Sequence, residues 1–287
     1  MQAVEGTPCL QFPLPPVPVV NPYLGTMEYC YSIIPLPMHD PDPLPIPGVI
    51  YPVWKSNLVP AFSQIWKLIS QGGRWFASID TEFPGTIYDY DKGRLHDPLY
   101  KYMMMKKNVN DTNIIQLGLT LADLNQNIYT WEFNFSDFDI DREDHKHIKR
   151  SIELLKRHGI DFWRNKEDGI PSHEFARMCR EVGLLENRLV ELTWVGFQIS
   201  SDLGYFTKIL TGQKLPDDFE EYKKAERIYF GDRVCDVKDM MNSFPTLKGG
   251  LNNVAEKLGI ARAAGKSHQA GSDSLLTYLT FIKLSSM

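Results

Sequence analysis

Asp80 and Glu82 are two acidic residues, two positions apart, at the end of the apolar and aromatic segment 75–83. If this segment is a β-strand, side chains at positions i and i+2 point to the same face, so both carboxylates enter one small volume. Like charges so close together repel each other, and a bound Mg²⁺ or Mn²⁺ would remove the conflict. A pair of such ions can activate water and stabilise the leaving oxygen in phosphodiester cleavage. A strand end that runs out into solvent explains the same spacing, so the residues alone leave both interpretations open.

The same spacing of acidic residues recurs elsewhere in the chain, which provides an internal control. The other pairs lie in Pro-rich or polar stretches, where a solvated surface explains them: Asp40 and Asp42, Asp89 and Asp91, Asp137 and Asp139, and Asp139 and Asp141. Asp80 and Glu82 differ because they end an apolar segment and precede a Pro-Gly pair. That context is compatible with a metal site without establishing one.

Three further residues are candidates for the same site, and each also has an ordinary structural role. Asp202 follows the strand-like segment 195–199 and is equally suited to cap a helix that begins near residue 203. Asp273 lies near the start of the predicted last helix, where an acidic side chain also suits the helix dipole. His268 lies five residues earlier in a Gly-containing segment that predicts a loop, and an imidazole with a pKa of about 6.5 suits a general base.

The elements that would position these residues are predicted from about residue 51 onwards, where helix-like and strand-like segments alternate. This alternation is typical of an α/β domain. Strands are predicted over 75–83, 113–121 and 128–135, with a hairpin turn at 123–127 between the last two, and shorter strands over 193–198 and 233–237. Helices are predicted over 58–71, 143–158, 172–182, 203–211, 236–242, 249–258 and 270–285.

Proline use divides the chain in two, since 14 of the 19 prolines fall within residues 1–60. Proline fixes φ and lacks a backbone donor, so these stretches exclude a helix or a central strand. We therefore expect residues 1–50 to form a Pro-rich, flexible N-terminal arm and residues 51–287 to form the folded domain. Because the residues between the prolines are mostly apolar, an arm that lies over the domain or binds a partner is the alternative.

The composition limits the remaining possibilities. A formal net charge of -5 gives no overall basic field, so any attraction for RNA must be local, from a metal site or a patch. The four cysteines form no C-x-x-C pair, which argues against a disulfide framework or a zinc knuckle. No apolar run approaches the roughly 20 residues of a membrane span. A soluble, intracellular protein without a membrane partner is expected.

Several of these segments together resemble the Caf/Pop-type deadenylases, the nuclease subunit of the Ccr-Not complex, in the DEDDh exonuclease superfamily. The resemblance covers about residues 53–283, nearly everything outside the arm. The first and last of the following segments are the most specific: Asp80-Thr81-Glu82-Phe83-Pro84-Gly85, Ile114-Ile115-Gln116-Leu117-Gly118-Leu119-Thr120, Trp131-Glu132-Phe133-Asn134-Phe135, Leu247-Lys248-Gly249-Gly250-Leu251 and His268-Gln269-Ala270-Gly271-Ser272-Asp273-Ser274-Leu275-Leu276-Thr277.

The resemblance implies an RNase H-like α/β fold, in which helices flank a mixed central β-sheet. It implies two divalent metal ions, Mg²⁺ or Mn²⁺, held by Asp80, Glu82, Asp202 and Asp273, and it implies that His268 deprotonates the attacking water. The implied activity is 3′→5′ hydrolysis of the poly(A) tails of messenger RNA with release of 5′-AMP. The implied partners are poly(A) RNA, a Not-type scaffold and the second deadenylase subunit of the Ccr-Not complex, in the cytoplasm and also the nucleus.

Phe83, Pro84 and Leu119 are candidates to line the entry for the terminal nucleotide, although apolar residues beside strands are equally suited to the core. The chain departs from the family pattern beside Asp202, where Gln198 replaces a histidine and Ser201 replaces an aromatic residue. These departures affect substrate positioning and rate more than the chemistry, because Asp202 itself is kept. The alternative to an active nuclease is a scaffold subunit of low or no activity that keeps the fold.

Overall fold

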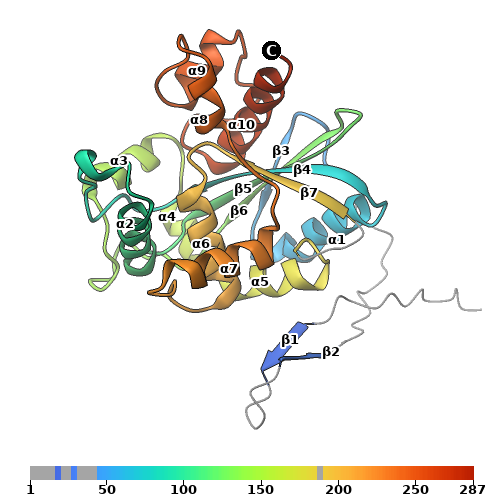
Figure 1. Cartoon of the computed structure of the whole chain (residues 1–287). Helices are drawn as coiled ribbons and strands as arrows, with labels where there is room; N and C mark the ends of the chain where they lie inside the picture. Colours follow the sequence, from blue (N-terminus) through green and yellow to red (C-terminus); the bar gives the residue numbers. More distant parts are fainter. Residues whose placement is uncertain (1–16, 21–26, 31–43, 186–189) are drawn as a thin grey trace, which may run out of the picture.

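A mixed six-stranded sheet forms the centre of the domain, in the order β3-β6-β5-β4-β7-β8 (Figure 1). The computed structural model describes residues 17–20, 27–30, 44–185 and 190–287. The strands of this sheet are β3 (Ile50–Val53), β4 (Gly73–Glu82), β5 (Gln116–Asp123), β6 (Ile128–Asn134), β7 (Val190–Gly196) and β8 (Val234–Asp236). β4 is antiparallel to β5 and parallel to β7, and β5 is antiparallel to β6. The longest of these strands, β4, therefore lies inside the sheet with neighbours on both sides.

Helices cover both faces of the sheet (Figure 1). One face carries α1 (Leu58–Ile69), α5 (Ser172–Glu181), α6 (Ser200–Thr211) and α7 (Phe219–Phe230). The other face carries α8 (Val237–Met240), α9 (Leu251–Lys257) and the long α10 (Ala270–Ser285). Beside the sheet lie α2 (Pro98–Asp111), α3 (Lys149–Arg157) and α4 (Phe162–Asp168), and short 3-10 turns occur at η1 (Lys55–Asn57), η2 (Lys92–Arg94) and η3 (Met241–Ser243).

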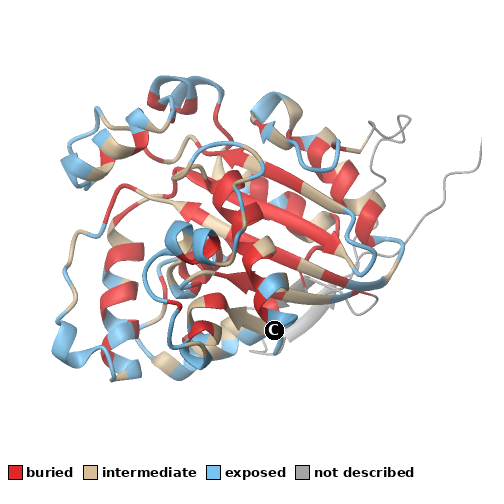
Figure 2. Ribbon diagram, turned by 90° about the horizontal axis from the view of Figure 1, so that it is seen from above, coloured by how far each residue is buried: buried red, intermediate tan, exposed pale blue. Residues whose placement is uncertain are grey.

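The alternating side chains of β4 separate two apolar cores. Ala77 and Ile79 point to the larger core, where the rings of Phe62, Phe133 and Phe175 pack with centroids 4.8 to 5.6 Å apart. Phe76 points the other way and packs on Tyr278 and Phe281 of α10. Figure 2 shows that the strands are largely buried between these layers. Successive residues of β4 thus belong to opposite faces, so the parity of a position decides which helices it meets.

All five predicted strands and the seven predicted helices appear, the last helix over the predicted residues 270–285 and the others with shifted ends, but one helix boundary is wrong. The helix predicted over 143–158 begins at Lys149, and residues 143–148 form a turn followed by irregular backbone. The Asp139 amide donates to His145 Nδ1 at 2.9 Å, and the side chains of Arg142 and Asp144 form an ion pair. His145 and His147 therefore lie in this non-helical segment. Three helices, α2, α4 and α7, and the strand β3 were not predicted from the pattern.

The N-terminal arm is described only in part. β1 (Val17–Val20) and β2 (Met27–Cys30) pair in an antiparallel two-stranded sheet. The remainder of residues 1–43 lies outside the described residues, so the flexibility expected for the arm stays a prediction. β3 contains Pro52 and is an edge strand of the main sheet, where a missing backbone donor is tolerated. Among the described residues no helix combines the length and apolar character required to span a bilayer.

Candidate active site

Four carboxylates from three separate elements converge at the end of β4. Asp80 and Glu82 lie at the end of β4, on the face of the strand that meets α10. Asp202 lies in the first turn of α6, and Asp273 lies in the first turn of α10. Burial raises the pKa of Asp80, and the negative charges of Asp202, Asp273 and Glu82 raise it further. Burial also raises the pKa of Glu82, again with contributions from Asp273 and Asp202. The four acidic residues predicted from the sequence therefore share one electrostatic environment.

Asp202 is attached directly to the strand that carries the other two acids. Thr81 faces the opposite side of β4 from Asp80, and its hydroxyl donates a 2.6 Å hydrogen bond to Asp202 Oδ1. α6 begins at Ser200, three residues earlier than predicted, so Asp202 is inside the first turn and does not cap the helix. The proposed capping role is therefore wrong, and Asp202 is a buried residue available to the site.

The segment before α6 is held by a fifth acidic residue, Asp236 of β8. Its carboxylate accepts from the backbone amide of Gln198 at 2.9 Å and from that of Ile199 at 3.2 Å. Gln198 has a φ of 60°, a left-handed conformation that costs free energy in a residue other than glycine. The two hydrogen bonds to Asp236 stabilise this backbone shape. Gln198, one of the two departures from the family pattern, is therefore strained and exposed beside the site.

Asp273 reaches the site because the start of α10 lies directly on the sheet. Gly118 of β5, which pairs with Asp80, has no side chain, and a Cβ there would lie 1.9 Å from the Ala270 carbonyl oxygen. Ser78 of β4 donates from its hydroxyl to the Ser274 carbonyl at 2.9 Å. These small residues permit the close approach that carries Asp273 to the carboxylates of β4.

The first backbone amides of α10 are satisfied by side chains of the sheet. The Ala270 amide donates to Gln116 Oε1 at 3.3 Å, and the Gly271 amide donates to Glu132 Oε2 at 3.1 Å. Gln116 in turn donates from Nε2 to Asn134 Oδ1 at 2.7 Å. Helix N-termini leave such amides without partners inside the helix, so these contacts replace a conventional cap. No local pattern signals these roles, although Gln116, Glu132 and Asn134 fall in the segments of the resemblance.

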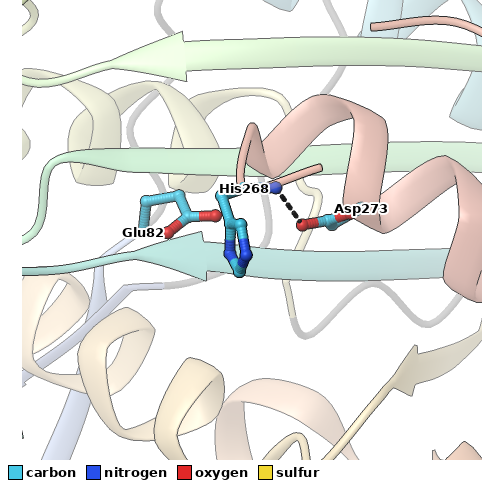
Figure 3. A group of neighbouring side chains, drawn as sticks. All are labelled: Glu82, His268 and Asp273. Atoms are coloured by element: carbon cyan, nitrogen blue, oxygen red, sulfur yellow. Dashed lines mark hydrogen bonds between the residues drawn. The ribbon is translucent and has the colours of Figure 1, made fainter. Parts of the chain in front are cut away.

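His268 lies on the loop just before α10, as predicted. Its backbone has a φ of 60°, and its amide donates to Asp273 Oδ2 at 2.9 Å (Figure 3). Ligand atoms of Glu82, His268 and Asp273 all lie within 4.8 Å of one another. Burial lowers the pKa of the His268 imidazole, and its ring meets the ring of His158 edge-on at 4.9 Å. A lowered pKa keeps the imidazole neutral near neutral pH, which a proton acceptor requires.

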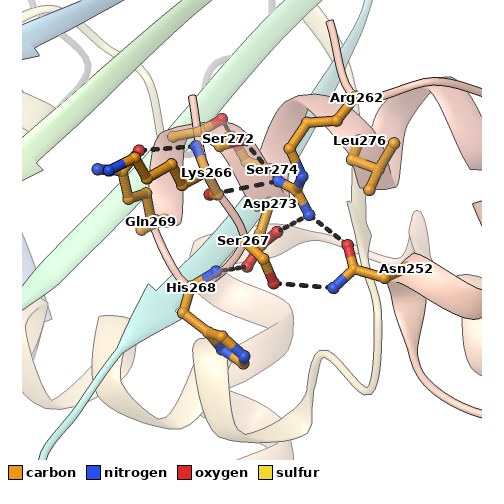
Figure 4. Close-up of polar contacts among 12 residues, drawn as sticks. Asn252, Arg262, Lys266, Ser267, His268, Gln269, Ser272, Asp273, Ser274 and Leu276 are labelled. Atoms are coloured by element: carbon orange, nitrogen blue, oxygen red, sulfur yellow. Dashed lines mark hydrogen bonds and ion pairs between the residues drawn. The ribbon is translucent and has the colours of Figure 1, made fainter. Parts of the chain in front are cut away.

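Arg262 is the cation nearest to this cluster among the interactions described, and it was not predicted. Its Nη2 lies 2.6 Å from Asp273 Oδ1 (Figure 4). Its charge lowers the pKa of Asp80, against the larger effects of burial and of the other acids. Arg262 lies outside every segment of the resemblance, which is why sequence reasoning missed it.

The donor set fits a hard divalent cation. Burial raises the pKa of Asp202 to about 7, and the pKa values of Asp80 and Glu82 are raised for the same first reason. Buried carboxylates that repel one another are costly unless a cation or protons compensate them. Mg²⁺ and Mn²⁺ prefer oxygen ligands, and carboxylates supply them. Asp80, Glu82, Asp202 and Asp273 are therefore suited to hold such ions, beside an imidazole that can accept a proton.

The three predicted substrate-lining residues fall in different places. Phe83 is half-buried and stacks on Tyr205, with ring centroids 4.9 Å apart, and it remains a candidate. Pro84 is buried, and its carbonyl accepts from the Ile148 amide at 2.9 Å. Leu119 is only 1% exposed and pairs with Ile79 on the face of the sheet opposite Asp80. The structure thus places Leu119 in the core, which corrects its suggested contact with the terminal nucleotide.

A cleft of about 980 Å³ opens beside the first turn of α6. Both departures from the family pattern, Gln198 and Ser201, line it, and Ser201 is the neighbour of Asp202 in the chain. Farther away it is bordered by residues of the loop before α2, of α2 and of α7, among them Tyr90, Lys101 and Phe219. The cleft therefore lies beside the first turn of α6, and its walls hold aromatic side chains together with four lysines and four acidic residues.

Several known proteins are similar to this chain in sequence. A model described as CAF1 family ribonuclease matches residues 53–191. Probable CCR4-associated factor 1 homolog 7 of Arabidopsis thaliana is 40% identical, over 81% of this chain and 85% of the relative. The chain belongs to the CAF1 family of ribonucleases. Poly(A) ribonuclease pop2 of Schizosaccharomyces pombe is 37% identical, over 82% of this chain and 68% of the relative. This CAF1-family protein is thus a nuclease, of the hydrolase class.

Solved structures agree with this assignment. S. pombe Pop2p, in a form with Mg²⁺ and Mn²⁺ bound, superimposes with a TM-score of 0.71 at 36% identity, over 83% of this chain and 92% of Pop2p. Yeast CAF1, co-crystallised with the NOT1 MIF4G domain, superimposes with a TM-score of 0.65 at 30% identity, over 85% of this chain and 91% of that chain. Escherichia coli exonuclease I superimposes with a TM-score of 0.50 at 16% identity, over 75% of this chain and 41% of that chain, and this similarity shows the fold alone. These similarities confirm the predicted RNase H-like α/β fold of the CAF1-family chain.

Proposed function

We propose that this CAF1-family protein is a 3′→5′ exoribonuclease that shortens the poly(A) tails of messenger RNA and releases 5′-AMP. The observation that carries the proposal is the convergence of Asp80, Glu82, Asp202 and Asp273 beside the His268 imidazole. A related protein is named Poly(A) ribonuclease pop2, which supports the choice of substrate. The alternative of an inactive scaffold is disfavoured, because an inert fold has no need to bury repelling carboxylates together.

The four carboxylates would hold two divalent ions, Mg²⁺ or Mn²⁺, and the structure of the related S. pombe Pop2p is a form with Mg²⁺ and Mn²⁺ bound. When bound, such ions supply activation of a water and stabilisation of the departing 3′ oxygen. His268 then accepts the proton of the attacking water, a role that its lowered pKa allows. The hydrogen bond from the His268 amide to Asp273 holds the His268 backbone next to the carboxylates.

RNA would reach these residues through the cleft beside α6. Single-stranded nucleic acid is generally held by aromatic side chains and lysines along a groove. Lys92 and Lys101 are exposed at the cleft, and Tyr90 and Phe219 are half-buried in its walls. The net charge of the whole chain is -5, and the cleft holds four lysines and four acidic residues, so the attraction for RNA would come from individual lysines such as Lys101 and not from an overall basic field.

A Not-type scaffold is the proposed protein partner, because a yeast relative, CAF1, was co-crystallised with the NOT1 MIF4G domain. A second deadenylase subunit of the Ccr-Not complex completes the proposed assembly. We place the protein in the cytoplasm, where messenger RNA is degraded, and also in the nucleus.

The test compares the purified protein with Asp80→Asn on 5′-labelled RNAs. One RNA ends in a run of A and the other in mixed bases, each incubated with Mg²⁺, with Mn²⁺ or with EDTA. The proposal expects a metal-dependent ladder on the A-tailed RNA, release of 5′-AMP and no ladder with the variant. Equal cleavage of both RNAs would reject the poly(A) preference, and a ladder that persists in Asp80→Asn would reject the assigned site.

A further inference from the structure

Arg262 lies in the segment that follows α9, and its guanidinium is enclosed by residues of three neighbouring segments. Its side chain is 17% exposed, and its Nη2 lies 2.6 Å from Asp273 Oδ1. Nη1 donates to Ser272 Oγ at 2.5 Å, and Nη2 donates to Asn252 Oδ1 at 2.5 Å (Figure 4). One guanidinium thus joins α9 to the first turn of α10.

The loop that carries His268 closes around this guanidinium. Asn252 donates from Nδ2 to Ser267 Oγ at 2.8 Å, next to His268 in the chain. Ser272 Oγ donates to the Ala264 carbonyl at 2.6 Å, and the Lys266 amide donates to Gln269 Oε1 at 2.8 Å (Figure 4). The loop from Arg262 to Gln269 is therefore tied at both ends to α9 and α10, with His268 between the ties.

Both oxygens of the Asp273 carboxylate are engaged. Oδ1 forms an ion pair with Arg262 Nη2 at 2.6 Å but accepts no hydrogen bond, and Oδ2 accepts from the His268 amide at 2.9 Å. A carboxylate fixed at both oxygens has one orientation, and each oxygen retains a second lone pair that can bind a cation. Without Arg262, Asp273 would be free to rotate and the loop would lose a central contact. Metal binding would then be weakened by the conformational entropy lost when the Asp273 side chain and the His268 loop become ordered.

We propose that Arg262 is a positioning residue, which sets the orientation of Asp273 and the place of the His268 loop before a metal ion binds. The inference deepens the proposed function and rests on it, since it takes Asp273 as a metal ligand. The fork of the guanidinium matters because its nitrogens reach Ser272, Asn252 and Asp273 together. A lysine ammonium is a point charge on a flexible stem and cannot reproduce that geometry.

A purely electrostatic role makes the opposite prediction. If Arg262 only neutralises the buried acids, it competes with the metal for Asp273, and its removal should tighten metal binding. If it positions Asp273, its removal should weaken metal binding, as the loss of groups that orient metal ligands generally does, by about 10- to 100-fold. The sign of the change in metal affinity therefore separates the two roles.

The experiment measures Mn²⁺ binding to the purified full chain by calorimetry and by electron paramagnetic resonance, without RNA. We expect Arg262→Gln to bind Mn²⁺ about 10- to 100-fold more weakly than the parent. Arg262→Lys, which keeps the charge but not the fork, should remain close to Arg262→Gln. The control is Lys257→Gln, which removes an exposed positive charge from the end of α9 and should bind like the parent.

Asn252→Ala provides a second variant if Arg262→Gln does not fold, because Asn252 is exposed and its loss removes the ties to Arg262 and Ser267. We expect its Mn²⁺ affinity to fall by several-fold. Parent affinity or tighter binding in Arg262→Gln, or full recovery in Arg262→Lys, would overturn the inference while leaving the proposed function intact. Absence of Mn²⁺ binding by the parent would overturn both.

Discussion

Thr81 and Asp202, 121 positions apart in the chain, are joined by a buried hydrogen bond of 2.6 Å between the threonine hydroxyl and carboxylate Oδ1. Thr81 lies between Asp80 and Glu82 on the opposite face of β4. The same three-residue stretch therefore supplies two acids to one side of the strand and holds the third acid from the other side. Parity along one strand explains how the site receives groups from both helical layers.

The isosteric substitution Thr81→Val should damage this connection without changing the volume of the core. Loss of a buried hydrogen bond to a charged group costs about 1.5–3 kcal/mol, so the free energy of unfolding should fall by about that amount. Since Asp202 loses its anchor, metal-dependent cleavage should fall as well. Urea unfolding and single-turnover cleavage measure the two effects.

The matched control is Thr280→Val, another buried threonine, whose hydroxyl bonds to the Leu276 carbonyl within α10, away from the carboxylates. It should lose stability without losing cleavage. If Thr81→Val and Thr280→Val cleave RNA equally well, the hydrogen bond has no part in positioning Asp202.

The raised pKa of Asp202 predicts how the stability of the metal-free protein depends on pH. Burial raises this pKa to about 7, whereas an aspartate in an unfolded chain titrates near 3.9. Between these values the folded state binds the proton that the unfolded state has lost. The free energy of unfolding in EDTA should therefore fall as pH rises from about 4 to about 7.

Thermal unfolding in EDTA across this pH range measures the effect, with Asp202→Asn as the comparison. The variant should lose less stability as pH rises, and some slope should remain because the pKa values of Asp80 and Glu82 are raised too. Adding Mg²⁺ at pH 8 should restore stability to the parent, since a ligand that binds only the folded state stabilises it. Identical pH slopes in parent and variant would show that Asp202 ionises normally.

The sequence was sufficient where local patterns decide the structure. The alternating strand that ends in Asp80 and Glu82 was predictable because parity along a strand follows from its own residues. The loop position of His268 and the placement of Asp273 at the start of α10 were likewise predictable from local signals. The family resemblance then connected Asp202, which local patterns alone favoured as a helix cap.

The remaining features depend on packing between distant segments. Leu119 was misplaced because the register of β5 against β4 decides which face it occupies, and no local signal reports that register. α2 was missed because Met103 is exposed while Met104 and Met105 are buried, so the apolar residues mark no single face. Arg262 acts only through the closed loop between α9 and α10, which has no signature in the sequence.

The absence of a side chain at Gly118 predicts a severe effect of Gly118→Ala. An added Cβ would lie 1.9 Å from the Ala270 carbonyl oxygen, and backbone cannot move aside as a flexible side chain can. Overpacking of this kind costs about 1–3 kcal/mol. Displacement of α10 should also carry Asp273 away from Asp80, so cleavage should fall more than stability does.

Gly250→Ala is the matched control, because an added Cβ there meets nothing within 4 Å. Circular dichroism melts and Mn²⁺ titrations of the two variants measure stability and site integrity. A Gly118→Ala protein that binds Mn²⁺ like the Gly250→Ala protein would show that α10 tolerates the shift.

The cleft beside α6 predicts a dependence on RNA length. Phe219→Ala should remove an aromatic wall of the cleft and raise KM for a long A-tailed RNA, with a smaller change for a dinucleotide that need not extend along the cleft.

Lys101→Glu reverses an exposed charge at the cleft, and loss of one phosphate contact should reduce the slope of log K against log salt by about 1. Lys224→Glu is the control, because Lys224 is exposed on α7 and does not line the cleft. Binding of A-tailed RNA to these variants in the Asp80→Asn background, measured by fluorescence anisotropy at several salt concentrations, tests the path. If Lys101→Glu and Lys224→Glu weaken binding equally, RNA follows another surface to the carboxylates.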